Sequence, residues 1–254
     1  MHALTKLYIQ KMSRQKLIYI FFGCFLVASL FYAFLISSPE MEKMLNINIE
    51  IVGRENFPEF MMRFYVGTVG ILFQVFLFNL YICDEDRTKM LYQPLLHGEN
   101  RIRIIKSKVF VAVFMSIVFM IVVAVINYMA AFMRWGYKIF EVQALMRIIE
   151  KYLLSCLYMS CITLGIIAAS LCTRSAWKNI FITIIYIILD TFICSTNIAL
   201  LKKIWIGGGP NLWLFSYEYL NLPIKDMLFG IIVMIMYGVF FYQLARYKIK
   251  RIDF

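Results

Sequence analysis

A stripe of polar residues in the last third of the chain is the sequence feature best suited to chemistry. Thr183, Asp190 and Asn197 recur every seven residues. Tyr186 lies one turn before the aspartate, so on a helix the four side chains share one face. The residues around Asp190 are apolar enough to span a membrane, where a charged carboxylate costs about 2.5–3.5 kcal/mol. We expect the stripe to line a substrate path or a subunit contact, or to hold a protonated carboxyl that bonds a neighbouring helix.

Motifs for ATP hydrolysis, zinc-dependent hydrolysis and acyl transfer are absent from the sequence. No Gly-Lys pair occurs, so the phosphate loop G-x-x-x-x-G-K-[ST] is missing. The two histidines, His2 and His97, cannot form H-E-x-x-H, and no G-x-S-x-G appears. The six cysteines fall in or beside apolar segments and have no histidine partner, which favours packing over metal binding. We therefore expect no catalytic site, no metal and no cofactor in this chain.

The composition requires a membrane around most of the chain. Of the 254 residues, 62% are hydrophobic and 17% are aromatic, and the mean hydropathy is +0.76. A soluble domain is only about 45–50% apolar. A helix that crosses about 30 Å of hydrocarbon needs roughly 17–25 apolar residues. The sequence predicts one all-α transmembrane domain over residues 1–254, with spans at 17–36, 64–83, 109–132, 152–172, 180–201 and 227–245. Asp190 is the only acidic residue that these boundaries bury in a span.

The basic residues predict that both ends of the chain are cytoplasmic. Sixteen Lys and Arg residues lie in the N-terminal arm, in the loops after the second and fourth spans and in the tail, against ten in the three segments on the opposite side. Lys and Arg are enriched on the cytoplasmic side of membrane proteins. This enrichment and contact with anionic lipid explain the net charge of +11 without any nucleic-acid partner.

Segment 202–226, between the fifth and sixth predicted spans, is too apolar for an aqueous loop. Glycines and a proline at 207–210 divide it, and its flanks at 204–206 and 212–220 are apolar and aromatic. Exposed glycine amides can bind anions, but no basic residue or Ser/Thr follows in the order of a phosphate loop. The pattern favours two short re-entrant helices that dip partly into the membrane.

Segment 84–108, between the second and third predicted spans, has the composition of a protein-docking element. Its charged residues surround an apolar pair, Leu95 and Leu96, and Pro94 and Gly98 interrupt the segment. A short surface helix that docks on a cytoplasmic protein has this pattern. An ordinary solvated loop with positive-inside charges is the alternative.

In residue order this loop resembles that of the type-2 family of ABC exporter permeases. There, an acidic residue and a Thr are followed by a Leu-Leu pair, an Arg and a Lys at the head of the third span. A basic arm at 4–16, a basic-then-Asp ending at 250–254 and the apolar segment 202–226 extend the resemblance to the whole chain. The chain departs from the family at 98–100, where Gly-Glu-Asn replaces a common Pro-Ile-Ser, so the register of the coupling helix stays open. The matching residues are Glu85, Thr88, Leu95, Leu96, Arg101, and Lys106 or Lys108.

The resemblance implies a permease that pairs with a second permease, identical or paralogous, and rests on a separate ABC ATPase subunit. That ATPase would bind the ATP and magnesium, and segment 84–108 would couple it to the spans. In size, and in lacking a large external domain, the chain is similar to the permeases of bacteriocin and lantibiotic immunity transporters in the bacterial cell membrane.

The apolar spans favour export of an amphipathic or hydrophobic substrate such as an antimicrobial peptide, a lipid or a drug. Two other classes of protein remain open. A substrate-binding membrane subunit of a vitamin importer is also small and spans the membrane about six times, but it would not need the long charged loop. A membrane enzyme would need several titratable residues at one depth.

Overall fold

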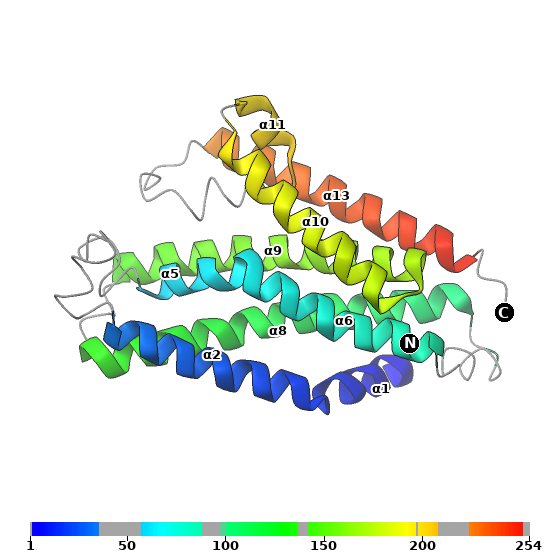
Figure 1. The fold of residues 1–254 in the computed structure, drawn as a ribbon, viewed down its shortest axis with the longest axis horizontal. Helices are drawn as coiled ribbons and strands as arrows, with labels where there is room; N and C mark the ends of the chain where they lie inside the picture. Colours follow the sequence, from blue (N-terminus) through cyan, green and yellow to red (C-terminus); the bar gives the residue numbers. More distant parts are fainter. Residues whose placement is uncertain are drawn as a thin grey trace.

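The computed structural model describes residues 2–35, 57–87, 98, 100–136, 142–196, 198–207 and 224–250. Every regular element in these residues is a helix (Figure 1). The elements are α1 (His2–Ser13), α2 (Lys16–Leu35), α5 (Phe57–Phe64), the π-helix η2 (Tyr65–Val69), α6 (Gly70–Arg87), α8 (Arg101–Trp135), α9 (Val142–Thr173), α10 (Ala176–Ser195), α11 (Ala199–Ile204) and α13 (Ile224–Lys250).

The structure confirms an all-α membrane protein with six spans. Within the described residues, six helical segments are long and apolar enough to cross a membrane. They are Lys16–Leu35, Phe57–Asn79, Ile102–Trp135, Ile149–Thr173, Ala176–Ser195 and Leu228–Ile249.

The helices of the second and fifth candidate spans have other bounds than those expected, and the third candidate span begins at residue 102 instead of 109. The second span begins at Phe57 and not at residue 64, because Glu59 and Arg63 neutralise each other one turn apart and so remain within the helix. The fifth span ends at Ser195 and not at residue 201. There the hydroxyls of Ser195 and Thr196 donate hydrogen bonds to carbonyls of the preceding turn. These bonds compete with the backbone hydrogen bonds that would continue the helix.

The helix α9 lies at the centre of the bundle and packs against α6, α8, α10 and α13. On the far side of α8 lie α1 and α2 (Figure 1). In the most apolar windows of the second and fourth spans 61% of the residues are buried, against 11% for α10 and 17% for α13. The outer faces of α10 and α13 are therefore left for lipid or for another protein.

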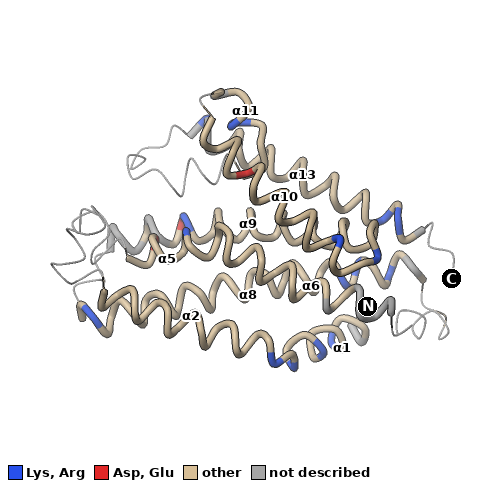
Figure 2. The backbone as a smooth tube through the Cα atoms, viewed as in Figure 1, with Lys and Arg blue, Asp and Glu red and all other residues tan. Residues whose placement is uncertain are grey.

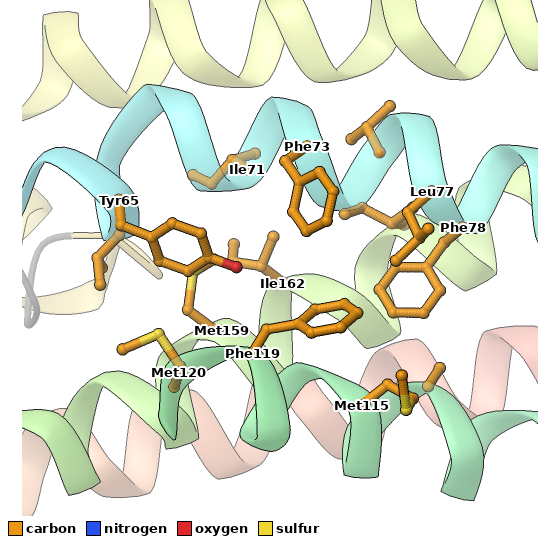
Figure 3. Close-up of a cluster of buried hydrophobic side chains, with 14 of the residues drawn as sticks. Tyr65, Ile71, Phe73, Leu77, Phe78, Met115, Phe119, Met120, Met159 and Ile162 are labelled. Atoms are coloured by element: carbon orange, nitrogen blue, oxygen red, sulfur yellow. The ribbon is translucent and has the colours of Figure 1, made fainter. Parts of the chain in front are cut away.

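The core between α6, α8 and α9 combines large apolar side chains with a few polar bonds. Tyr65 and Phe73 from the second span meet Phe119 of α8 and Met159 of α9 in a compact cluster (Figure 3). Beside it, Gln74 donates to the Ser116 hydroxyl at 2.9 Å and accepts from the Thr163 hydroxyl at 2.8 Å. Similar bonds join Asn127 to Tyr152 and Asn79 to Ser170 and Asn179. The buried amides thus bind helices to one another.

The beginning of α1 and the end of α13 lie at the same end of the bundle (Figure 1). The end of α6, the start of α8 and the turn between α9 and α10 lie there too. Lys and Arg residues gather near this end, and others mark the opposite end (Figure 2). Six crossings, an even number, place both ends of the chain on the same side of the membrane, which agrees with this arrangement. That this side is the cytoplasm stays a prediction.

Candidate functional site

The second span is broken where it faces α10. Its helix changes from α5 to the five-residue π-helix η2, inside which Gly67 leaves the helical region with φ −73° and ψ −130°. Gly70 then starts α6, and a Cβ at this position would overlap the carbonyl oxygen of Tyr65. Glycine at position 70 therefore allows the close turn that ends η2. Breaks of this kind are frequent at functional sites.

A groove of about 510 Å³ separates this break from α10. That volume is within the range of small-molecule sites, about 300–1,000 Å³. Its walls are mainly apolar, with Arg63 and Asp190 as the charged residues among the described lining. The lining comprises Phe60, Arg63, Phe64, Gly67, Thr68, Val69 and Ile71 from the second span, and Ile187, Asp190, Thr191 and Cys194 from α10.

The Asp190 carboxylate bonds to the segment that follows α11. Its Oδ1 accepts a hydrogen bond from the indole nitrogen of Trp205 at 2.6 Å. The Trp205 ring stacks on Tyr186, with ring centroids 5.9 Å apart and an interplanar angle of 19°. Gly207 packs directly on the carboxylate, where a Cβ would overlap it. Tyr186 precedes Ser195, the end of α10, by about 13 Å of helix, so the chain folds back along α10 after α11.

This fold-back bears on the predicted re-entrant pair between the fifth and sixth spans. The helix α11 and residues 205–207 supply a first short helix and its return along α10. Residues 208–223, which would form the rest of the pair, lie outside the described residues. The re-entrant pair therefore stays a prediction.

The predicted polar stripe is divided between two cavities. Asp190 lines the groove, whereas Thr183 and Tyr186 line a cavity of about 310 Å³ between α6, α9, α10 and α13. The Tyr186 hydroxyl lies 3.2 Å from that of Tyr158, and the Thr183 hydroxyl donates to the Asn179 carbonyl in its own helix. Asn197 lies outside the described residues. All three described members of the stripe thus contact protein.

An ionic cluster that the sequence did not predict joins α5 to α9. Glu59 forms ion pairs with Arg63, one turn later in the second span, and with Lys151 of α9 at 2.7 Å. Both Glu59 and Arg63 are buried, so Asp190 is not the only buried acid in a span. The spacing of Glu59 and Arg63, four residues apart, is the sequence signal that could have revealed the pair. The pair was missed because both residues precede residue 64, where the second span was expected to begin.

The predicted coupling residues fall mostly outside the described part of the chain. Thr88, Leu95 and Leu96 are not described. Glu85 belongs to α6 and Arg101 begins α8, but their side chains are not described either. The structure does show how α8 starts, because the Asn100 side chain accepts from the amide of residue 102 at 3.0 Å. It also separates the two candidate lysines, since Lys106 is exposed and Lys108 is buried.

Comparison with known protein families gives a match. A family model described as "ABC-2 family transporter protein" matches residues 6–190, from α1 to Asp190. The matched region contains the whole of the first four spans, segment 84–108 and most of α10. No curated protein and no solved structure matches the chain.

Proposed function

Because the chain belongs to the ABC-2 transporter family, and is thus a membrane subunit of an ABC transporter, we propose that it is the permease of an exporter. The groove beside the broken second span carries this proposal. It offers an apolar wall of phenylalanine and branched aliphatic side chains, with a guanidinium and a carboxylate among its lining residues. An amphipathic or hydrophobic molecule, such as a peptide, a lipid or a drug, fits such a surface best.

In this proposal, energy comes from a separate ABC ATPase that holds the ATP and magnesium. The ATPase docks on segment 84–108 through Leu95 and Leu96, with Glu85, Thr88 and Arg101 around them. The end of α6 and the start of α8, which flank this segment in the sequence, lie at the end of the bundle where α1 begins and α13 ends (Figure 1), and that end faces the cytoplasm of a bacterial cell. The family supports an ATPase partner in general.

A second permease, identical or paralogous, completes the transporter. Support comes from the sparse burial of α10 and α13, whose outer faces carry large exposed side chains such as Phe181, Phe192 and Phe240. Lipid covers whatever part of these faces the second permease leaves open.

The proposal is tested by purifying the native chain from its own membranes and measuring ATPase co-purification and substrate-stimulated ATP turnover. Joint replacement Leu95→Ala/Leu96→Ala should weaken ATPase binding about 30-fold, because truncated hot-spot residues cost about 2 kcal/mol or more. Glu85→Lys should lower stimulated turnover more than binding, because rim charges orient partners more than they hold them. The matched control is Leu7→Ala, which truncates an exposed apolar side chain of α1 at the same end.

Normal binding and turnover in both variants would contradict docking through segment 84–108. A native chain that purifies with a bound vitamin and a scaffold protein would indicate an importer subunit. Transport by Asp190→Leu, compared with native at matched membrane abundance, tests the groove, since this change empties its carboxylate position without adding a charge to the span. Unchanged transport would give Asp190 a structural role only.

A further inference from the structure

The cavity of about 310 Å³ between α6, α9, α10 and α13 exists because one face of α9 carries small residues. Four of them line the cavity at spacings of three or four residues, so they share one side of the helix. They are Gly165, Ala168, Ala169 and Cys172. Phe241 of α13 lies with its ring against Gly165 and forms the facing wall. We call this space the α9 cavity.

The interior of the α9 cavity suits hydrocarbon and not water. The Thr183 hydroxyl donates to a carbonyl of its own helix, and the Tyr186 hydroxyl lies 3.2 Å from that of Tyr158. Among the polar side chains that line the cavity, the Asn179 Oδ1 lacks a hydrogen bond. A buried water needs about two to four polar partners, so this single acceptor does not hold one. Apolar cavities of this kind stay dry and take up apolar molecules.

The size and the opening of the α9 cavity fit one flexible chain. A cavity of about 150 Å³ holds a six-carbon ring, so 310 Å³ holds roughly a dozen carbons. The lining extends from Asn179 to Tyr186, about 10 Å along α10. Ile182 and Cys172 in the wall are exposed, so the cavity opens to the outside of the bundle. Both residues belong to membrane spans, and the medium outside is therefore the acyl chains of lipids.

Two lysines mark one end of this opening. On α10, Lys178 lies one turn before Ile182, on the same helix face. On α13, Lys248 lies one turn after Leu244, again on the same helix face. The start of α10 and the end of α13 lie at the end of the bundle where Lys and Arg residues gather (Figure 1, Figure 2). Both cations thus lie between the cavity and the membrane surface at that end.

We propose that the α9 cavity binds one acyl chain of an anionic phospholipid, whose phosphate is held between Lys178 and Lys248. The chain supplies the van der Waals partners that the cavity wall lacks, and the lysines attract the negative headgroup. The bound lipid then packs between α10, the least buried span, and the centre of the bundle. This site does not depend on the proposed function, because neither an ATPase nor a transported substrate takes part.

The first test measures lipid binding to the purified native chain in mild detergent by native mass spectrometry. Dioleoyl phosphatidylglycerol should bind about 25-fold more tightly than dioleoyl phosphatidylcholine, because each of the two cations contributes about fivefold. Lys178→Gln/Lys248→Gln should remove this preference. The matched control is Lys6→Gln/Lys106→Gln, which removes two exposed lysines near the same end and should keep the preference within about twofold.

The second test separates the cavity from a merely basic surface. Ala169→Phe places a ring in the α9 cavity and should weaken phosphatidylglycerol binding about tenfold or more, because excluding even two methylenes from an apolar site costs that much. Ala28→Phe is the control, because Ala28 is a partly buried alanine of α2 that does not line the cavity. Glycerol phosphate carries the headgroup charge without the chain and should not compete.

A native thiol reports on the cavity without any substitution. Cys172 is exposed in the cavity wall, whereas Cys24 is exposed on α2, away from the cavity. At a phosphatidylglycerol concentration about ten times its Kd, methyl methanethiosulfonate should modify Cys172 about tenfold more slowly. The rate at Cys24 should stay unchanged.

Equal binding of the two lipids would overturn the proposal, as would an equal loss of preference in Lys6→Gln/Lys106→Gln. Normal phosphatidylglycerol binding in Ala169→Phe would place the lipid on the outer surface only and would also overturn it. If the substituted chains do not fold, the native Cys172 measurement decides. An unchanged rate at Cys172, or an equal slowing at Cys24, would exclude an acyl chain in the α9 cavity.

Discussion

The bond between Asp190 and Trp205 can be measured with a double-mutant cycle. Trp205→Phe removes the indole donor and keeps a ring over Tyr186, and Asp190→Leu removes the acceptor. A hydrogen bond to an ionised carboxylate contributes about 1.5–3 kcal/mol, whereas neutral interhelical bonds in membranes average about 0.6 kcal/mol. The bond is 2.6 Å long, and short bonds of this kind are the stronger ones, so we expect a coupling energy of about 1.5 kcal/mol or more.

The assay is denaturant unfolding of the purified chain in mild detergent, for native, both single variants and the double variant. Trp177→Phe provides the control, because Trp177 lies on the same helix and is 81% exposed. The changes that Trp177→Phe and Asp190→Leu make to the free energy of unfolding should add within about 0.5 kcal/mol. A coupling energy near 0.6 kcal/mol would be that of an average interhelical hydrogen bond in a membrane and would contradict the stronger bond expected here. A value indistinguishable from the Trp177 control would refute the fold-back of residues 205–207 along α10.

Three further predictions concern the break, the ionic cluster and the orientation. Gly70→Ala should destabilise the protein by roughly 1–3 kcal/mol, because its Cβ would overlap a backbone carbonyl. The control Gly23→Ala has open space around the new Cβ and should be neutral or stabilising. Equal melting temperatures for the two variants would contradict the break. Glu59→Gln should cost on the order of 3 kcal/mol, because two cations lose their shared carboxylate, and Glu150→Gln at an exposed site should change unfolding little. In intact cells, an impermeant maleimide should not label Glu99→Cys, and labelling would reverse the orientation.

Hydropathy could predict the six spans because each span is a long apolar run. In lipid, the backbone of such a run satisfies its hydrogen bonds by forming a helix. It could also place Asp190 on a protein-facing side, since a carboxylate on the lipid side is costly. It could not place Glu59 and Arg63 inside the second span, because a hydropathy sum counts two charges where the helix has a neutral pair.

Contacts between distant residues set the remaining features, and no local pattern encodes them. Lys106 and Lys108 are equivalent in the sequence, and only the approach of α1 and α6 makes one buried and the other exposed. Likewise, the Trp205 partner of Asp190 follows from the return of the chain after α11. Gly67 and Gly70 mark a weak point in a helix, but glycine is also frequent in straight transmembrane helices.

The π-helix η2 also has a consequence for how this protein can change over evolutionary time. A π-helical turn accommodates one residue more than an α-helical turn, and each residue of an α-helix rotates the chain by about 100°. The single extra residue therefore sets the angular phase between α5, which presents Glu59 to α9, and α6, which presents Phe73 to α2 and α8. Point substitutions within residues 65–69 leave that phase intact, whereas a one-residue deletion would straighten the span and rotate one set of side chains away from its partners. Lineages of this protein should therefore differ by substitution through residues 65–69 and keep the length of that stretch constant.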